Sequence, residues 1–445
     1  MRFSELDGAQ VGVWGAGREI RSFATQLAQR LPSARLAIVA SDDALDDRAR
    51  AALKAPAAEF VSGSGVLPAL AGCDVVVRSP GVSIYRAEME ELRRQARPVT
   101  TATALWLEER GPARVVGVTG TKGKSTTAAV IAHLAGAAGW SVSLAGNIGL
   151  PALDLLDVPD ADVTVIELSS YQIADLAVGP ETAVFTNLYH EHVDWHGSHE
   201  VYCTDKLRML ELPGVATAVV NARDPVLTDA ADGNSRVLFY GVSSGWDASG
   251  DGVSRRGELV IPRSRLPLLG EHNALNVCAA AAALEVLGVD PVPRPDVLAG
   301  FRPLPHRLEQ VAERDGVLWV DDSISTTPES TAAALESLGG RDVVLIGGGH
   351  DRGQDYAELG RTLSTRGAAV IGLPVTGARL VAAARAAGVA HARAVEAVDM
   401  EAAVATARDL ARPGVAVLLS PGAPSYGVYR DFVARGQHFR RLIGA

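Results

Sequence analysis

The stretch "VGVTGTKGKSTTAAV", residues 116–130, limits the fold of this chain more than any other. An apolar strand runs into a glycine-rich loop, then into Lys124 and Ser125, then into a run of helix formers. This order directs backbone N–H groups and a helix N-terminus at an anion, while the lysine neutralises phosphate and the serine ligates Mg²⁺. The generic spacing Gly-x-x-x-x-Gly-Lys-Ser needs a glycine at position 118, where this chain has Val118. An ordinary glycine-rich turn is the alternative, but the joint presence of strand, Lys-Ser pair and helix favours a phosphate-binding loop.

Strand-and-loop units recur along the whole chain. Its 445 residues suffice for three domains of roughly 150 residues. The segment "QVGVWGAGREI" reads as a strand, a glycine turn and a helix, which is how a doubly wound α/β unit begins. The joints "EERGPAR" and "GVDPVPRPDVLAGFRPLPHR" precede further series of strands. We therefore expect an α/β protein with domains at residues 1–110, 111–302 and 303–445, doubly wound in the first and third and built around the phosphate loop in the second.

Composition narrows the classes of protein that fit. A formal net charge of −10 argues against a nucleic-acid or anionic-lipid partner. Three widely spaced cysteines (Cys73, Cys203 and Cys278) show no metal-ligand spacing and suit a reducing compartment. The N-terminal segment has acidic residues where a signal peptide would be basic and apolar, and no apolar run is long enough to span a bilayer. We expect a cytoplasmic protein without membrane insertion.

Ionisable residues stand at the ends of the central strands. Glu167 ends the strand of "VIELSSYQ", where a second acidic metal ligand would lie. His192 belongs to the cluster "NLYHEHVDWHGSHE", whose other polar residues read as a solvated loop. Lys206 in "YCTDKLRML" would, on its own, read as a surface lysine of a helix.

Taken together, the motifs resemble those of the Mur ligases, the ATP-dependent enzymes that build the peptidoglycan stem peptide. The segments "TGTKGKST", "GNIG", "ELSSYQ", "NLYHEHVDWH", "DK", "EHNALN", "LPHR", "DDS" and "LLSPGAPS" occur in the order found in that family and cover the whole chain. The family's loop is T-G-T-x-G-K-S/T, which accounts for the unusual glycine placement. Asparagine is common there where this chain has Lys122, so that position departs from the family pattern.

The resemblance implies ATP and Mg²⁺ as cofactors and assigns residues to them. The phosphate loop would comprise Gly120, Thr121, Lys122, Gly123, Lys124, Ser125 and Thr126. Further nucleotide contacts would come from Asn273, Asn276, Arg307 and Asp322. Ser125 and Glu167 would bind one Mg²⁺ and His192 a second, while Lys206 resembles the lysine that these enzymes carbamylate to make a metal-directed group. Lys124, Glu167, His192 and Lys206 are therefore the expected catalytic residues.

The resemblance also implies a reaction. A substrate carboxylate attacks the γ-phosphate of ATP to give an acyl phosphate, and the amine of an amino acid then displaces phosphate. Because an acyl phosphate hydrolyses readily, closure of the third domain over the second is expected to exclude water.

Length and the C-terminal segment resemble the family's second ligase, which adds glutamate to UDP-N-acetylmuramoyl-L-alanine. The first domain would bind the UDP end of that substrate, and folylpolyglutamate synthases lack this domain. Implied substrate contacts are Gly15, Gly17, Arg18, Ser41, Asp42 and Gly81 for UDP, Asn147 for the muramoyl group, and Ile324, Thr326, Arg352, Ser425 and Phe432 around glutamate.

One departure concerns the chirality of the glutamate. D-glutamate enzymes typically read D-S-K-A-T-N where this chain reads "DSISTT", so that Ile324 replaces a lysine near the incoming amino acid. Losing a charged hydrogen bond costs about 1.5–3 kcal/mol, and Arg352 is a candidate replacement cation. "DSISTTPES" with "LLSPGAPSYG" resembles the branch that adds L-glutamate, whose product a separate epimerase inverts. A D-glutamate ligase with a diverged pocket is the alternative.

A different class, a nucleotide-binding regulator that has lost catalysis, would also keep the fold. It predicts loss of Glu167, His192 and Lys206, and all three are present. The expectation is therefore a monomeric ligase acting on small molecules, with an epimerase as its functional partner if it uses L-glutamate.

Overall fold

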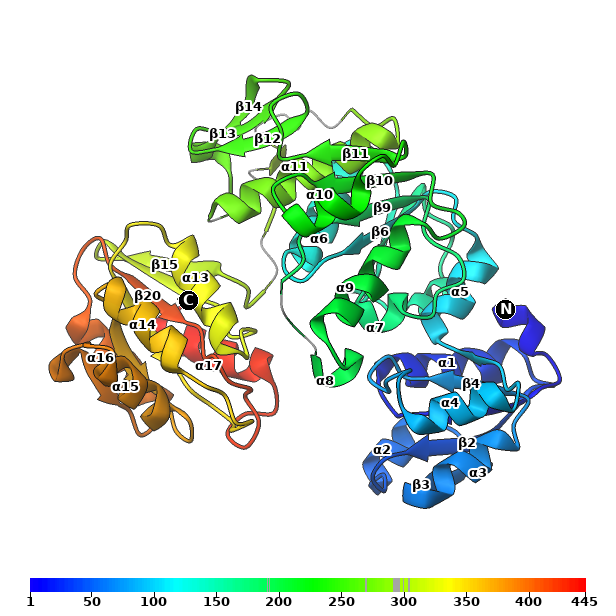
Figure 1. The fold of residues 1–445 in the computed structure, drawn as a ribbon. Helices are drawn as coiled ribbons and strands as arrows, with labels where there is room; N and C mark the ends of the chain where they lie inside the picture. Colours follow the sequence, from blue (N-terminus) through cyan, green and yellow to red (C-terminus); the bar gives the residue numbers. More distant parts are fainter. Residues whose placement is uncertain (190, 192, 269, 291–296, 299, 303–304) are drawn as a thin grey trace. The chain divides into compact units, whose positions relative to one another are not determined.

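The computed structural model describes residues 1–445 except 190, 192, 269, 291–296, 299 and 303–304. It divides into two compact units, residues 1–266 with 274–301 and residues 267–273 with 302–445. Figure 1 shows the chain with its labelled elements, coloured from the N-terminus to the C-terminus. Each unit is an arrangement of sheets and covering helices.

The first unit begins with a five-stranded parallel sheet in the order β3-β2-β1-β4-β5. Its strands are β1 (Gln10–Trp14), β2 (Arg35–Ser41), β3 (Glu59–Ser62), β4 (Val75–Arg78) and β5 (Val99–Thr100). Its helices are α1 (Arg18–Arg30), α2 (Asp47–Ala52), α3 (Val66–Ala71), α4 (Ala87–Arg94) and α5 (Ala102–Arg110). Every residue of β4 is buried, as expected for a parallel strand covered on both faces.

A six-stranded parallel sheet follows in the same unit, in the order β11-β10-β9-β6-β8-β7. Its strands are β6 (Val115–Thr119), β7 (Val142–Gly146), β8 (Val163–Glu167), β9 (Thr182–Phe185), β10 (Thr217–Asn221) and β11 (Val237–Tyr240). Its helices are α6 (Lys124–Ala137), α7 (Ser170–Ile173), α8 (Val193–His196), α9 (His199–Leu207), α10 (Pro225–Ala231) and α11 (Glu271–Val286). A small antiparallel sheet joins it, formed by β12 (Trp246–Ser249), β13 (Gly252–Arg255) and β14 (Glu258–Pro262).

One continuous hydrophobic core runs through the two larger sheets of the first unit. It includes Val13 and Trp106 from the N-terminal part and Ile166 and Phe185 from the central part. Because apolar burial is the dominant stabilising term, this shared core makes the two sheets one packed body.

The second unit holds a six-stranded sheet in the order β15-β16-β20-β17-β18-β19. Its strands are β15 (Glu309–Arg314), β16 (Val317–Asp321), β17 (Val343–Gly347), β18 (Ala369–Gly372), β19 (Ala394–Glu396) and β20 (Ala416–Leu419). Its helices are α13 (Pro328–Ser337), α14 (Ala357–Thr365), α15 (Gly377–Ala386), α16 (Met400–Leu410) and α17 (Phe432–Ile443). Only the edge strand β15 pairs antiparallel, and separate apolar clusters cover the two faces.

These sheets confirm the predicted α/β class with doubly wound first and third parts and a phosphate-loop sheet between them. Each large sheet lies inside one predicted domain range, but the boundaries 1–110, 111–302 and 303–445 stay a prediction. Within the residues that the structure describes, no helix is both long and apolar enough to cross a bilayer.

Candidate functional site

The loop between β6 and α6 has the backbone that a phosphate-binding loop needs. Gly120 and Gly123 have φ angles of +142° and +83°, a region that side chains disfavour. A Cβ added at Gly120 would lie 1.9 Å from Thr186 Oγ1, and one at Gly123 would lie 2.5 Å from Asn276 Oδ1. Glycine is therefore required at both positions, because neighbouring side chains leave no room for a Cβ and because the φ angles are positive.

Residues after β9 hold this loop in place. The Thr121 N–H donates to the Asn187 carbonyl at 2.7 Å, and the Lys122 N–H donates to Asn187 Oδ1 at 2.8 Å. Thr186 Oγ1 donates to the Lys122 carbonyl at 2.6 Å. Thr186 and Asn187 were not predicted: the sequence places them after an apolar strand, but only the structure shows that this strand pairs with β6.

Lys124 is the first residue of α6, so its backbone belongs to the helix N-terminus. Its Nζ donates to the carbonyl oxygens of Gly120 at 2.9 Å and Thr121 at 2.8 Å, and the side chain therefore arches over the loop. Ser125 and Thr126 follow on the same first turn and are buried. The predicted phosphate loop is thus assembled as one local unit.

Glu167 ends β8 next to this loop, since β6 and β8 pair with Val118 opposite Glu167. The side chain is 1% exposed. Asn147 Nδ2 donates to Glu167 Oε1 at 3.1 Å, whereas Glu167 Oε2 is buried with no hydrogen-bond partner among the described residues. A buried oxygen left without a donor costs free energy unless a cation or other partner reaches it. The carboxylate therefore fits the predicted role of a divalent-metal ligand.

Lys206 is buried beside the same loop, contrary to its reading as a surface lysine. Its Nζ donates to the Gly120 carbonyl at 2.9 Å and lies 3.4 Å from Thr119 Oγ1. Burial, and secondarily the charge of Lys124, lower the pKa of Lys206 well below its usual value, against the opposing carboxylates of Glu191 and Glu167. A lowered pKa makes the deprotonated amine, the nucleophilic form, easier to reach than in an ordinary lysine.

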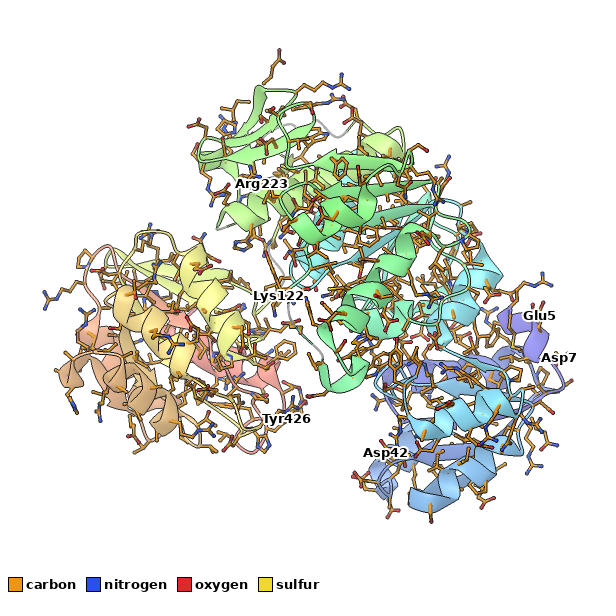
Figure 2. The ribbon with its side chains drawn as sticks, in the orientation of Figure 1. Glu5, Asp7, Asp42, Lys122, Arg223 and Tyr426 are labelled. Carbon is orange, nitrogen blue, oxygen red and sulfur yellow. The ribbon has the colours of Figure 1, made fainter. Side chains whose placement is uncertain are left out.

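Lys122, the departure from the family pattern, forms an ion pair with Glu191. Figure 2 labels this side chain. His192, predicted as a metal ligand, lies outside the described residues. The ion pair therefore places Glu191 beside the phosphate loop.

The two predicted asparagines lie on the first turns of α11. Thr127 Oγ1 donates to Asn276 Oδ1 at 3.2 Å, which places Asn276 against the helix that follows the phosphate loop. Asn273 is also buried and its N–H donates to the Gly270 carbonyl. The structure therefore brings Asn276 to the loop.

The predicted UDP contacts meet at one edge of the N-terminal sheet. Gly15 follows β1, Ser41 ends β2, Asp42 follows it, and Gly81 follows β4. The Gly15 N–H donates to the Ala40 carbonyl at 2.7 Å. The carboxyl ends of parallel strands form the ligand crevice in such sheets, so these residues lie where a ligand would bind, and their contact with UDP stays a prediction.

Two of these residues already have strong partners. The carboxylate of Asp42, labelled in Figure 2, accepts two hydrogen bonds from Arg86 at 2.8 and 2.9 Å. Arg18, one residue after Gly17, donates to the carbonyl oxygens of Gly149, at 3.0 Å, and Gly146. Arg18 therefore ties the first glycine turn to the "GNIG" loop that carries Asn147.

In the second unit, Asp322 and Arg307 are placed around the start of β15 and the end of β16. Asp322 accepts from the Leu308 N–H at 3.1 Å and from Ser420 Oγ at 2.7 Å. Burial raises the pKa of Asp322 to about 6 despite these hydrogen bonds. Arg307 Nε is buried with no hydrogen-bond partner in the part of the chain that the structure describes, as suits a donor intended for an anion.

The predicted glutamate residues come from three loops of the second unit. Ile324 is half-buried and its N–H donates to the His306 carbonyl at 3.1 Å; Thr326 follows on the same loop. Arg352 is exposed, with its guanidinium 5.7 Å from the ring centre of Tyr426. Ser425 is buried, and Phe432 begins α17 with its ring edge-on to His306. Tyr426 was not predicted, and its place beside Ser425 was the only signal.

Replacing Gly120 with alanine is expected to destabilise the protein by about 1–3 kcal/mol, because the new Cβ would clash with Thr186 and the φ angle would be strained. Chemical denaturation would measure the shift. Gly136→Ala is the matched control, since Gly136 lies in α6 and its added Cβ would meet no atom within 4 Å beyond its chain neighbours and the nearby backbone of its own helix. That control should stabilise by about 0.4–1 kcal/mol; equal effects of the two variants would contradict the loop geometry.

Two family descriptions match the chain, the Mur ligase middle domain at residues 118–284 and the Mur ligase, glutamate ligase domain at residues 306–422. A protein of Xanthomonas euvesicatoria named UDP-N-acetylmuramoyl-L-alanine--L-glutamate ligase is 41% identical over 462 aligned residues, covering 100% of this chain and 97% of that protein. A protein of the same name from Salinispora tropica is 42% identical, covering 100% and 99%. The solved MurF ligase of Thermotoga maritima in complex with ADP has the same fold, with a TM-score of 0.55, 17% identity and coverage of 99% and 96%.

Proposed function

The chain belongs to the Mur ligase family, and on that premise we propose that it joins L-glutamate to UDP-N-acetylmuramoyl-L-alanine by an ATP-dependent amide ligation in peptidoglycan precursor synthesis. The names of the full-length relatives support the substrate pair. The observation that carries the proposal is the assembly of the phosphate loop, Glu167 and Lys206 around Gly120. A regulator without catalysis would not need a buried lysine beside that loop.

The phosphate loop would bind ATP through its backbone N–H groups and Lys124. We propose that Lys124 leaves the carbonyl oxygens of Gly120 and Thr121 to contact the phosphates, which neutralises charge as the γ-phosphoryl group transfers. The ADP named in the MurF ligase structure supports a nucleotide at this site. Asn273, Asn276, Arg307 and Asp322 would complete the nucleotide contacts.

Ser125, Glu167, His192 and carbamylated Lys206 would hold Mg²⁺, with Glu167 Oε2 as the best-supported ligand atom. The metal would supply charge neutralisation at the transferring phosphoryl group. Lys206 would become a ligand when its neutral amine adds CO₂ and releases a proton, which leaves an anionic carbamate. Its lowered pKa favours that addition.

The substrate carboxylate would attack the γ-phosphate to form an acyl phosphate and ADP. The amine of glutamate would then attack the acyl carbon, releasing phosphate and leaving an amide. Gly15, Gly17, Arg18, Ser41, Asp42 and Gly81 would bind the UDP end, and Asn147 the muramoyl end. Asn147 donates a hydrogen bond to Glu167, so this bond would connect the muramoyl site to the metal site.

The pocket of the second unit would select the glutamate through Ile324, Thr326, Arg352, Ser425 and Phe432. Ile324 cannot donate a charged hydrogen bond, and Arg352 beside Tyr426 is the candidate cation for a glutamate carboxylate. We propose that the enzyme is a monomer in the cytoplasm. The three cysteines are free among the described residues, which suits a reducing compartment. A separate epimerase would act on its product.

Parallel reactions with L-glutamate and D-glutamate test this proposal, each containing ATP, Mg²⁺ and UDP-N-acetylmuramoyl-L-alanine. Phosphate release and product mass are measured in both, with a reaction lacking glutamate as the control. The expected result is an amide product only with L-glutamate. Product with D-glutamate alone would make the chain a D-glutamate ligase, and no product with either would reject the substrate pair.

A further inference from the structure

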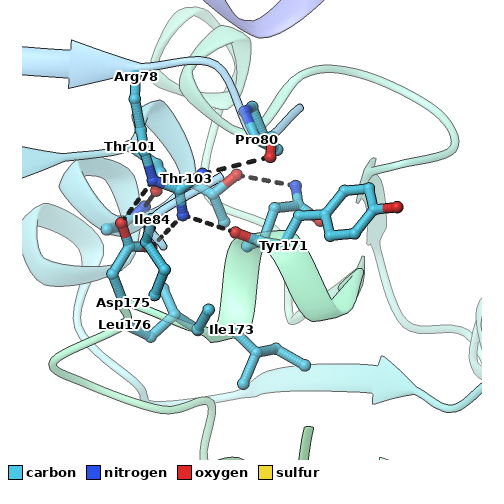
Figure 3. Close-up of polar contacts among 12 residues, drawn as sticks. Arg78, Pro80, Ile84, Thr101, Thr103, Tyr171, Ile173, Asp175 and Leu176 are labelled. Carbon is cyan, nitrogen blue, oxygen red and sulfur yellow. Dashed lines mark hydrogen bonds and ion pairs between the residues drawn. The ribbon is translucent and has the colours of Figure 1, made fainter. Parts of the chain in front are cut away.

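Arg78, the last residue of β4, is fully buried, which is unusual for an arginine. Its Nε and Nη2 donate to the two carboxylate oxygens of Asp175, both at 2.8 Å. Nη2 also donates to the Tyr171 carbonyl at 2.7 Å, and Nη1 to the Val82 and Pro80 carbonyls at 3.0 and 3.2 Å. Figure 3 shows this fan of contacts. The planar guanidinium thus donates hydrogen bonds to two separate chain segments.

The first segment is residues 79–85, which we call the substrate-domain loop. It follows β4 at the sheet edge where the predicted UDP contacts gather, and it contains Gly81. Three backbone carbonyls of this loop converge on Arg78 Nη1, including that of Ser79 at 3.4 Å. A side chain that satisfies several carbonyls of one turn fixes the path of that turn.

The second segment directly follows Glu167, the proposed metal ligand. Glu167 ends β8, Ser169 caps the short helix α7, and Tyr171 and Asp175 lie within and just after that helix. Arg78 therefore connects the substrate-domain loop to the segment that continues from Glu167.

Three more contacts fasten the same loop to the helices that lead to Lys206. Ser83 Oγ donates to the Trp195 carbonyl at 2.6 Å, and Trp195 Nε1 donates to the Pro80 carbonyl at 3.0 Å. Tyr85 Oη donates to the carboxylate of Asp205 at 2.8 Å, and Asp205 directly precedes Lys206 in α9. The loop is therefore held between the Glu167 side and the Lys206 side of the site.

We propose that Arg78 is a positioning residue that sets the register between the bound UDP-linked substrate and the phosphate-transfer site. This inference rests on the proposed function, because it assigns the substrate-domain loop to the UDP-linked substrate. Arg78 touches neither the phosphate loop nor Glu167 itself in the hydrogen bonds described above. It acts by keeping the loop and the α7 segment in one arrangement.

Arg78→Lys tests the inference, because lysine keeps the positive charge but lacks the planar guanidinium that donates to both segments. Since small misplacements of reacting groups cost about 10²-fold in rate, we expect kcat/KM for UDP-N-acetylmuramoyl-L-alanine to fall on that order. ATP·Mg²⁺ affinity, measured by calorimetry, should stay unchanged. Arg30→Lys is the matched control: Arg30, at the end of α1, pairs with Asp157 of the central part at 2.9 Å, but at an exposed position. It should leave both quantities unchanged.

Amide hydrogen exchange gives a readout that does not depend on activity. In Arg78→Lys, the amides of residues 79–85 and 168–175 should exchange faster together, and those of residues 120–127 should keep their wild-type rates. Tyr85→Phe, which removes only the hydroxyl contact to Asp205, is a milder second variant that should lower kcat/KM without loosening residues 168–175.

The outcomes distinguish failure of the proposed function from failure of the positioning role of Arg78. An inactive wild type with accelerated exchange in Arg78→Lys would reject the proposed function and keep the connection. An active wild type whose Arg78→Lys variant shows unchanged kinetic constants, or equal losses in ATP and substrate binding, would overturn the positioning role.

Discussion

Replacing Lys124 with methionine is expected to lower kcat by about 10²–10³-fold, the usual loss when one preorganised donor to developing charge is removed. Methionine keeps the length and apolar stem of the side chain, so packing beside α6 should change little. In the wild type the Lys124 ammonium contacts the Gly120 and Thr121 carbonyls. The variant has no ammonium there to neutralise charge on the transferring phosphoryl group. Steady-state phosphate release and ATP affinity would both be measured.

Lys54→Met is the control for this variant, because Lys54 is an exposed lysine of the N-terminal part. It should have wild-type kcat. A Lys124→Met enzyme that retained wild-type kcat would contradict the assignment of residues 120–126 as the catalytic phosphate loop.

Lys206→Ala is expected to cost about 10³-fold or more in kcat, because a metal-directed ligand contributes several kcal/mol of charge stabilisation and each 1.36 kcal/mol is tenfold in rate. The hydrogen-bond partners of Lys206, the Gly120 carbonyl and the Thr119 hydroxyl, are uncharged, so we expect the fold to persist without its side chain. Circular dichroism and ATP binding would establish that the variant is folded before its turnover is compared.

The carbamylated state itself is tested with the wild-type enzyme. Depleting CO₂ and bicarbonate should reduce turnover, and adding bicarbonate should restore it, because the carbamate forms and dissociates at the amine of Lys206. Lys206→Ala should not respond to bicarbonate. A wild type indifferent to CO₂ would show that Lys206 acts as an amine, and normal turnover by Lys206→Ala would remove it from the site.

Features that depend on neighbouring residues in the sequence were predictable. The phosphate loop is one of them, since strand, glycines, Lys124 and helix follow each other within a short segment. The position of Glu167 could also be predicted, because strand ends meet at one edge of a parallel sheet. Lys206 was assigned from the family resemblance alone; its burial beside Gly120 gives that assignment a physical basis.

Contacts between distant segments were not predictable from local pattern. Arg78 and Asp175 are 97 residues apart, and nothing in "VVVRSPG" distinguishes a buried arginine from an exposed one. Thr186 and Asn187 support the phosphate loop only because β9 pairs with β6. Such pairings depend on strand order, which hydrophobic periodicity does not specify.

Transfer of ¹⁸O is the most direct test that the chain phosphorylates a carboxylate before making the amide. UDP-N-acetylmuramoyl-L-alanine carrying ¹⁸O at both carboxylate oxygens is turned over with L-glutamate, ATP and Mg²⁺, and the released phosphate is analysed by mass spectrometry. An acyl-phosphate route predicts one ¹⁸O atom in each phosphate released, and the remaining label in the amide product. Amide product formed with unlabelled phosphate would contradict the route, and with it the role given to Lys124, Glu167 and Lys206.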